Sequence, residues 1–218
     1  MEDQNTSSTM KLVDSVDEQA LLEDMLDLSK PPVPAACQHL HYLQYTPFRY
    51  TARHATRFRE KGDRRGVYYA SEKVETCATE VAFYRVLFYL ESPDTSPSPR
   101  PFEMTAFRTQ VGWATADITA FDDVGPYVDP TTYAAPHTLA AQVRAADGQI
   151  IRFPSVRDKG GVNLAVLTCA AFKSGIGETQ GWWFRFGEHG LFATQRFGEG
   201  RLEFPFTMFA DDPRIIIP

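Results

Sequence analysis

Apolar residues recur at helical spacing near the start of the chain. Ser15 followed by Glu18 has the form of a capping box, in which a serine and a glutamate three residues later cap the start of a helix. The apolar positions that follow fit one helical face, and they are Val16, Leu21, Leu22, Met25 and Leu26. The prolines of KPPVP (30–34) end this helix. We predict a disordered tail over 1–13, then an acidic helix with its linker over 14–40.

The pattern is mixed from residue 40 to residue 101. The aromatic stretch LHYLQYTPFRY (40–50) is predicted to be extended and to lead into an arginine-bearing loop or short helix. GVYYA (66–70) predicts a short strand. Residues 76–90 are apolar almost throughout, which is typical of a mostly buried helix. The proline-rich segment 92–101 is predicted to be a loop.

The rest of the chain alternates between strand and helix signals. Residues 103–119 predict one or two strands. Pro136 suits the first turn of a helix that Gly148 ends. Further strands are expected at 149–154, at 162–169 and in the aromatic, glycine-punctuated last third. The sequence therefore predicts an α+β domain over 41–218, with a compact mixed sheet, flanking helices and an N-terminal helical extension.

Composition and charge narrow the class of protein. With 43% hydrophobic and 23% charged residues, the 218-residue chain is typical of a globular protein. It has no apolar run long enough for a membrane span and no signal-like N-terminus, so we expect a cytoplasmic protein. Its three cysteines show no CxxC spacing, which favours three reduced thiols over a disulfide framework or a zinc site. The five histidines have no persuasive metal spacing, and no bound metal is expected.

Charge is concentrated in two places. Residues 1–30 account for the whole net charge of −6, and the remainder of the chain is neutral. Within that neutral part, residues 49–65 hold seven basic side chains against Glu60 and Asp63. Such a focused cluster suits a small anion better than the broad basic surface of a nucleic-acid-binding protein. The acidic helix is expected to pack on the body, while masking of this cluster and contact with a partner remain alternatives.

Three segments contain candidate chemistry. FRYTARHATRF (48–58) carries arginines that either are solvated or converge on an anion. The strand GVYYA offers Tyr69 as a stacking platform, and Glu80 follows on a helix that is otherwise apolar around it. That carboxylate is either on an exposed stripe or held by an arginine or hydroxyl partner. Ser155 and Arg157 lie in a loop after a strand, where Ser155 could bind a ligand or cap a turn.

Taken in order, these segments resemble the RES domain, the toxin component of bacterial toxin–antitoxin systems whose antitoxin is an Xre-type protein. The matching pieces are PFRY (47–50), ATRF (55–58), GVYYA (66–70), TCATE (76–80) and FPSVRDKGGVN (153–163). They span about residues 45–185. ATRF departs from the family's glycine-serine start, and TCATE has Cys77 and Thr79 where small or aliphatic residues are usual. Residues 1–40 lie outside the resemblance.

The resemblance implies a fold related to ADP-ribosyltransferase toxins and an activity on NAD⁺ as substrate. The family's reactions are hydrolysis or phosphorolysis of NAD⁺, or transfer of ADP-ribose to a protein. It also implies an Xre-type antitoxin that covers the active site in a hetero-oligomer, with nucleic acid contacted only through the antitoxin. A non-enzymatic basic-patch protein is the remaining alternative, and it predicts binding that is insensitive to Glu80.

Roles for individual residues follow from this resemblance and from the chemistry of NAD⁺ cleavage. Glu80 would stabilise the positive charge that develops on the ribose. Arg49 and Arg57 would bind the pyrophosphate, and Tyr69 would stack on nicotinamide. Ser155 would hold the ribose or Glu80. The expected catalytic residues are therefore Glu80, Arg49 and Ser155, and the expected NAD⁺-binding residues are Arg57, Tyr69, Arg53, Arg157 and Asn163, with Arg64 and Arg65 secondary.

Overall fold

A computed structural model describes residues 8–92, 94–112 and 114–216 of the chain. The first half of the expected disordered tail, residues 1–7, lies outside the described residues, as do Pro93 in the expected loop and Trp113 in the expected strand region. Within the rest of that tail, Ser8–Lys11 forms a short 3₁₀ helix.

One of two four-stranded sheets carries most of the motif residues. Its strand order is β1-β5-β4-β3, with β1 at Tyr68–Ser71, β5 at Val162–Val166, β4 at Ile150–Pro154 and β3 at Thr115–Asp117. The β3–β4 pair is parallel and the other pairs are antiparallel. Helix α5, Ala134–Ala145, contributes Ala140 and Val143 to a core shared with this sheet, and the short α4, Gly125–Val128, precedes it.

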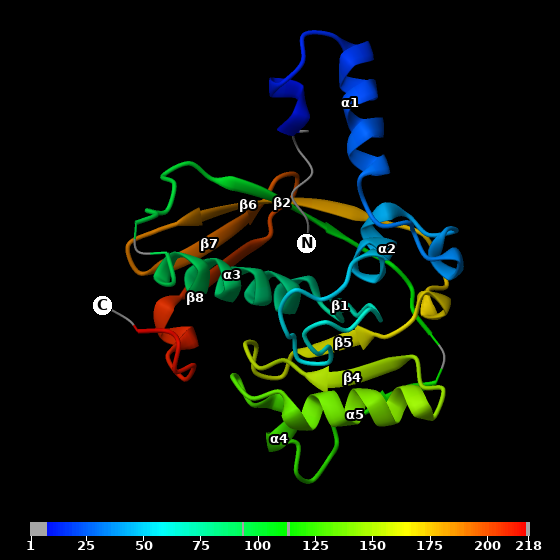
Figure 1. Cartoon of the computed structure of the whole chain (residues 1–218). Helices are drawn as coiled ribbons and strands as arrows, with labels where there is room; N and C mark the ends of the chain where they lie inside the picture. The colour runs from blue at the N-terminus through cyan, green and yellow to red at the C-terminus, as the bar shows by residue number, and fades with distance from the viewer. Residues whose placement is uncertain (1–7, 93, 113, 217–218) are drawn as a thin grey trace.

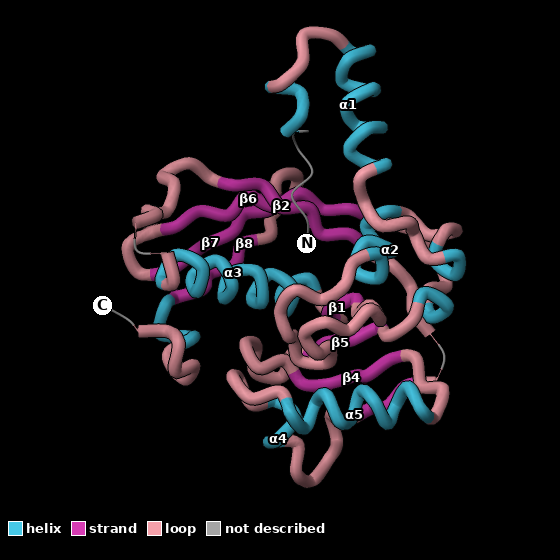
Figure 2. The backbone as a smooth tube through the Cα atoms, viewed as in Figure 1, coloured by secondary structure: helices cyan, strands magenta, loops and turns pink. Residues whose placement is uncertain are grey.

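The second sheet is antiparallel and has the order β2-β6-β7-β8. Its strands are β2, Phe102–Phe107; β6, Thr179–Phe186; β7, Gly190–Gln195; and β8, Arg201–Pro205. Helix α3, Val74–Leu90, packs its Ala78, Ala82 and Phe83 side against the inner face of this sheet. Figures 1 and 2 show α3 lying between the two sheets, with its N-terminus close to β1.

These elements confirm most of the predicted pattern. The structure is α+β, and its strands are divided between one mixed and one antiparallel sheet. The buried helix at 76–90, the strand at 66–70 and the pair of strands around 150–166 are confirmed with small shifts of their ends. The helix expected from Pro136 begins two residues earlier, at Ala134. No helix among the described residues is long and apolar enough to cross a membrane.

The aromatic segment predicted as extended is instead a helix. Residues Tyr42–Arg49 form α2, which begins with a capping box between His41 and Gln44. Gln44 is fully buried, and its side-chain amide donates hydrogen bonds to Thr109 and to the carbonyl of Ser174. Phe48 joins a core cluster with Tyr68 and Phe172. Tertiary burial of one helical face therefore outweighs the strand preference of the aromatic residues.

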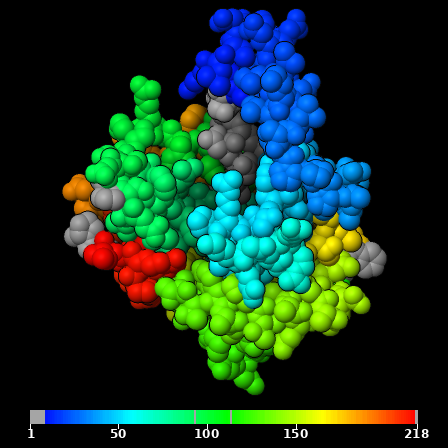
Figure 3. All heavy atoms as spheres, viewed as in Figure 1, coloured from blue at the N-terminus to red at the C-terminus, as the bar shows by residue number. Residues whose placement is uncertain are grey.

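The N-terminal acidic helix does not pack on the body in the way predicted. Helix α1, Val16–Leu28, buries no residue, and Leu21 and Met25 are 61% and 59% exposed. Ser15 caps it as expected, accepting a hydrogen bond from the backbone N–H of Glu18. Figures 1 and 3 show α1 projecting from the rest of the molecule. It contacts the body near its C-terminal end, where Asp27 pairs with Arg49 of α2.

The prediction of three reduced thiols is wrong for two of the cysteines. Cys37 and Cys169 form a disulfide across a sequence separation of 132 residues. Cys37 ends the 3₁₀ helix Ala35–Cys37, and Cys169 begins the 3₁₀ helix Cys169–Ala171, just after β5. Both side chains are buried in the core cluster that contains Phe48. The disulfide therefore ties the linker after α1 to the end of the first sheet. Cys77 is not part of a disulfide.

Candidate active site

Glu80 is the centre of a hydrogen-bonded cluster at the surface of α3 that faces the first sheet. Its Oε1 atom accepts a hydrogen bond of 2.8 Å from the Ser155 hydroxyl and one of 2.7 Å from the Asn163 side-chain amide. Glu80 is half-buried and Asn163 is buried. The sequence left open whether an arginine or a hydroxyl would hold this carboxylate, and in the structure its partners are a hydroxyl and an amide.

The two donors are themselves held in place. Ser155 directly follows β4, and its oxygen also accepts hydrogen bonds from the backbone N–H groups of Arg157 and Asp158. Asn163 lies on β5, where its Oδ1 accepts a 2.6 Å hydrogen bond from Ser71 of β1. Because both donors are fixed, the Glu80 carboxylate is oriented before any ligand arrives, which is the condition for strong electrostatic stabilisation.

The loop that carries Ser155 is packed tightly on the start of α3. Thr76 donates a 2.6 Å hydrogen bond to Asp158 of the loop. A Cβ atom at Gly161 would lie 2.4 Å from the Asp158 carboxylate and 2.7 Å from the Thr76 hydroxyl. Glycine is therefore required at position 161 by this close approach, and the GG of the sequence motif has a structural explanation.

Tyr69 stands on β1 beside this cluster. Its hydroxyl accepts a hydrogen bond from the backbone N–H of Phe58 and is 3.0 Å from the Thr56 hydroxyl. Burial of the hydroxyl raises the pKa of Tyr69 to about 12, although 39% of the residue's surface is exposed. The phenol therefore stays neutral at physiological pH, and the exposed part of its ring is available for stacking.

Two of the predicted arginines line the same space. Arg57 donates from NH1 to the carbonyls of Tyr127 and Asp129, both at 2.8 Å, and its guanidinium lies over the Tyr133 ring. Burial lowers the pKa of Arg57, but it has no carboxylate partner within the described residues. Its guanidinium is held by carbonyl dipoles and a ring face and feels the Glu80 carboxylate only through space, which leaves its hydrogen-bonding groups able to attract an anion.

Arg157 is held differently. Its NH1 atom forms a 2.6 Å ion pair with Asp212, and both side chains are buried. The guanidinium also lies over the Phe83 ring, 3.7 Å from its centroid. Phe83 and Glu80 are three residues apart on α3, so the two lie on neighbouring parts of one helical face.

These side chains surround one cavity of about 590 Å³. Its polar wall includes Arg57, Tyr69, Glu80, Arg157 and Asn163, and its apolar wall includes Val81, Tyr84, Phe88 and Phe153. The volume suits a small organic ligand. A cavity lined by both a carboxylate and arginines can hold a ligand that is both cationic and anionic.

The structure leaves two of the predicted arginines outside this cavity. Arg49 donates to the Asp27 carboxylate of α1 and to the carbonyl of Pro31. It lines a neighbouring hollow of about 660 Å³, which shares Tyr69 with the first cavity. Arg53 is exposed on the loop that follows α2.

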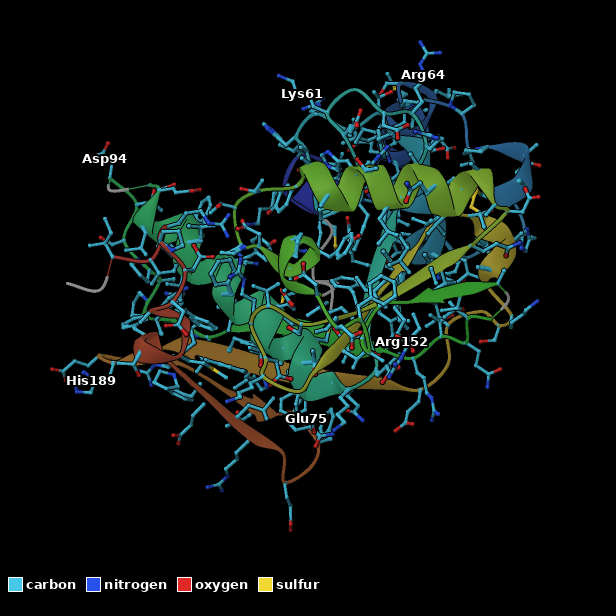
Figure 4. The ribbon with its side chains drawn as sticks, turned by 90° about the horizontal axis from the view of Figure 1, so that it is seen from below. Lys61, Arg64, Glu75, Asp94, Arg152 and His189 are labelled. Atoms are coloured by element: carbon cyan, nitrogen blue, oxygen red, sulfur yellow. A yellow bond between two sulfur atoms is a disulfide. The ribbon has the colours of Figure 1, made fainter. Side chains whose placement is uncertain are left out.

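The rest of the basic cluster also points elsewhere. Arg65 pairs with Asp63 of the same loop, and Arg59 donates to backbone carbonyls, including that of Pro47. Lys61 and Arg64 point away from the molecule (Figure 4). The cluster that looked dense in the sequence is therefore divided, and Arg57 is the member that reaches the cavity with Glu80.

Sequence reasoning missed several residues that shape the site. Asp212 and Arg214 come from the C-terminal segment, and Thr56 and Tyr84 contact or line the cavity. The available signal for Tyr84 was its place on a predicted buried helix, and the signal for Thr56 was its place as the second residue of the matched ATRF piece (55–58). No local pattern marks the pairing of Asp212 with Arg157, because the two residues are distant in sequence. No group of three or more metal-binding side chains occurs among the described residues.

The fold is α+β, and its cavity is lined by an oriented carboxylate, one half-buried arginine (Arg57) and one buried arginine (Arg157). This is consistent with the ADP-ribosyltransferase-like class to which the RES domain belongs. The family model of the RES domain matches residues 33–187. The chain belongs to the RES domain family, which comprises NAD-related enzymes of toxin–antitoxin systems. No curated protein matches the chain.

Proposed function

We propose that this chain is the toxin of a bacterial type II toxin–antitoxin system and cleaves the nicotinamide–ribose bond of NAD⁺, by hydrolysis or phosphorolysis. The observation that carries the proposal is the Glu80 carboxylate, oriented by Ser155 and Asn163 at the wall of a cavity that also contains Arg57 and Arg157. NAD⁺ has the complementary charges, with a cationic nicotinamide ring at one end and an anionic pyrophosphate in the middle.

The proposed chemistry follows from where charge develops. As the bond between the ribose C1 atom and the nicotinamide nitrogen breaks, its electron pair moves to the ring, and nicotinamide leaves as a neutral molecule. The ribose becomes positively charged, and an oriented carboxylate stabilises this charge more than it stabilises the bound ground state. Water or phosphate then forms the new C–O bond at C1, and attacking water releases a proton to solvent, giving ADP-ribose or its 1-phosphate.

Other side chains would hold the substrate in place. The exposed part of the Tyr69 ring lies at the cavity, where it would stack on the nicotinamide ring. Arg57 would bind the pyrophosphate through its positive charge, since it has no carboxylate partner within the described residues. The apolar wall, which includes Val81 and Phe88, would limit the access of water to the leaving group.

The test is nicotinamide release from NAD⁺ by the purified chain, with and without phosphate. Glu80→Gln keeps the side-chain volume but removes its charge, and we expect kcat/KM to fall about 10²- to 10³-fold. Glu75→Gln is the matched control, because Glu75 lies on the same helix and is exposed (Figure 4). No nicotinamide release by the unmodified chain under any of these conditions contradicts the proposal, and full activity of Glu80→Gln contradicts the role of Glu80.

The alternative reaction is transfer of ADP-ribose to a cellular protein. It uses the same bond cleavage and the same carboxylate, and it differs only in the nucleophile. NAD⁺ labelled in its adenosine half separates the two, because transfer leaves label on a macromolecule and hydrolysis or phosphorolysis leaves it in solution. We propose that an Xre-type antitoxin covers the cavity, so addition of that partner should suppress nicotinamide release.

A further inference from the structure

The C-terminal segment brings a second arginine, Arg214, next to Arg157 of the cavity wall. Asp212 follows the 3₁₀ helix Phe206–Phe209, and its carboxylate is 1% exposed. Its Oδ2 atom is 2.6 Å from NH1 of Arg157 and 2.8 Å from NH2 of Arg214, while Oδ1 accepts a 2.9 Å hydrogen bond from Nε of Arg214. One buried carboxylate therefore holds two guanidinium groups.

The charge of this cluster differs from that of a simple ion pair. Arg157 with Asp212 alone would be neutral and would attract an anion only weakly. Adding Arg214 gives two positive charges against one negative charge, which leaves a net charge of +1 on a cluster whose member Arg157 lines the cavity. Burial by itself would raise the pKa of Asp212, but hydrogen bonds from Arg214 and the charges of both arginines hold it below its usual range, so the carboxylate stays ionised.

The cluster lies next to the residues that line the cavity. Both guanidinium groups lie over the ring of Phe83, which is on α3 three residues after Glu80. The charges of Arg157 and Arg214 also act on Tyr84, whose ring lines the cavity. Figures 1 and 3 show the C-terminal segment beside α3. Phe209 and Ile215 anchor this segment in the same core as Phe83.

We propose that Asp212 and Arg214 complete a subsite for the pyrophosphate of the substrate, with Asp212 as the positioning residue for Arg157 and Arg214 as the source of the additional positive charge. This inference rests on the proposed function. It extends the site to a segment outside the residues 33–187 that the family model matches. A pyrophosphate carries two negative charges, and guanidinium groups bind phosphate oxygens through paired, charge-assisted hydrogen bonds.

Arg214→Met is the main test, because it removes the charge and keeps much of the side chain. We expect the Kd for ADP-ribose, measured by calorimetry, to rise about tenfold, in keeping with the loss of a charged hydrogen-bond partner. Arg214→Lys, which retains the charge, should stay within about threefold of the unmodified chain. Inhibition by nicotinamide, which has no pyrophosphate, should be unchanged. In turnover, Arg214→Met should raise KM for NAD⁺ and leave kcat nearly unchanged.

Control variants distinguish a role of Arg214 in substrate binding from a role only in holding the C-terminal segment in place. Arg201→Met removes an exposed arginine of β8 and should leave the ADP-ribose Kd unchanged. If Arg214→Met binds ADP-ribose as tightly as the unmodified chain, the subsite is wrong even though NAD⁺ cleavage stands. Equal weakening of ADP-ribose and nicotinamide would indicate a disturbed fold and would also overturn it. If the unmodified chain neither binds ADP-ribose nor releases nicotinamide, the proposed function fails, and the subsite fails with it.

Discussion

Two arginine–aspartate ion pairs in this molecule have similar geometry and different surroundings. Arg157 and Asp212 are 2.6 Å apart at the cavity wall, with side chains that are 6% and 1% exposed. Arg49 and Asp27 are 2.8 Å apart at the foot of α1, where the arginine side chain is 7% exposed, much as in the first pair, but the aspartate side chain is 60% exposed. The resemblance to the RES domain gave both arginines a role in binding or cleaving NAD⁺. In the structure the first is fixed at the cavity, and the second is held by the projecting helix.

The difference shows that the aspartate determines how available each arginine is. Asp212 is anchored by a core segment, so its pair is rigid and the pKa of the carboxyl is lowered in a buried setting. Asp27 is on a helix that buries no residue, and water and salt compete with its pair. A buried pair positions a side chain, whereas an exposed pair can exchange its partner for a ligand.

Breaking the buried pair should have the largest effect. We expect Asp212→Asn to lower the free energy of unfolding by about 3–5 kcal/mol at pH 7, because it leaves Arg157 buried without its counter-charge. Denaturant unfolding followed by fluorescence measures this change. Asp27→Asn is the matched variant in the exposed pair, and its unfolding midpoint should stay close to that of the unmodified chain. A midpoint for Asp212→Asn equal to that of Asp27→Asn would contradict the comparison.

The same variant has a defined pH dependence. The folded-state pKa of Asp212 lies below its unfolded value of about 3.9. Its contribution to stability is therefore fully present above the unfolded pKa and is lost as the pH falls through the folded pKa. The stability gap between the unmodified chain and Asp212→Asn should be constant from pH 7 to about pH 5 and should narrow below that.

Removing the Cys37–Cys169 disulfide should have the next largest effect, since it anchors the linker after α1 to the end of the first sheet. We expect Cys37→Ser to lower the free energy of unfolding by about 2–4 kcal/mol, because the closed loop is long and the unfolded chain gains freedom. A reducing agent should lower the stability of the unmodified chain by a similar amount and leave Cys37→Ser unaffected. Cys77→Ser, outside the disulfide, is the control. Equal stability of Cys37→Ser and the oxidised chain would show that the disulfide does not constrain the fold.

The residues of the cavity could be predicted where a short motif sits at the end of a strand or on a helix. Glu80, Ser155 and Asn163 occur within such motifs, and the structure brings the three together. Tyr69 on β1 follows for the same reason. Local sequence determines these positions, because each lies on or directly after an element whose type the hydrophobic pattern specifies. Arg57 is different, since it lies in a turn and only the ATRF piece marked it.

What could not be predicted depends on contacts between distant segments. The partners Asp212 and Asp27 come from the two ends of the chain, and nothing in the sequence links them to Arg157 and Arg49. The Cys37–Cys169 disulfide is missed for the same reason, as its cysteines are 132 residues apart. The extended prediction for 40–50 failed because burial of Gln44 and Phe48 favours a helix there.

The exposed pair gives a smaller effect, on binding rather than on folding. Arg49 lines a hollow that shares Tyr69 with the cavity, but it does not reach the cavity that contains Glu80. We expect Arg49→Met to raise KM for NAD⁺ about tenfold, as expected for a charged hydrogen-bond partner, and to leave kcat nearly unchanged. Arg53→Met, an exposed arginine of the following loop, should leave both constants unchanged. A fall in kcat comparable to that of Glu80→Gln would instead assign Arg49 to the bond-breaking step.

Releasing Arg49 from its partner should give the smallest effect. In Asp27→Asn, Arg49 has lost its ion pair with Asp27, so substrate binding no longer has to break that pair. KM for NAD⁺ should therefore fall about twofold to threefold at low salt. The change should disappear at high ionic strength, because salt screens an exposed pair. Asp24→Asn, an exposed carboxylate of the same helix, is the control.

The double variant decides whether this effect passes through Arg49. If Asp27 acts only by holding that guanidinium, Asp27→Asn in the Arg49→Met background should leave KM unchanged, whereas two independent effects would add. An unchanged KM in the single variant Asp27→Asn would mean that substrate binding does not compete with the helix. An unchanged KM in Asp27→Asn, or additive effects in the double variant, would show that the Arg49–Asp27 pair is only a structural contact of α1. An anion-binding arginine in this fold would then require a buried aspartate partner such as the Asp212 that pairs with Arg157.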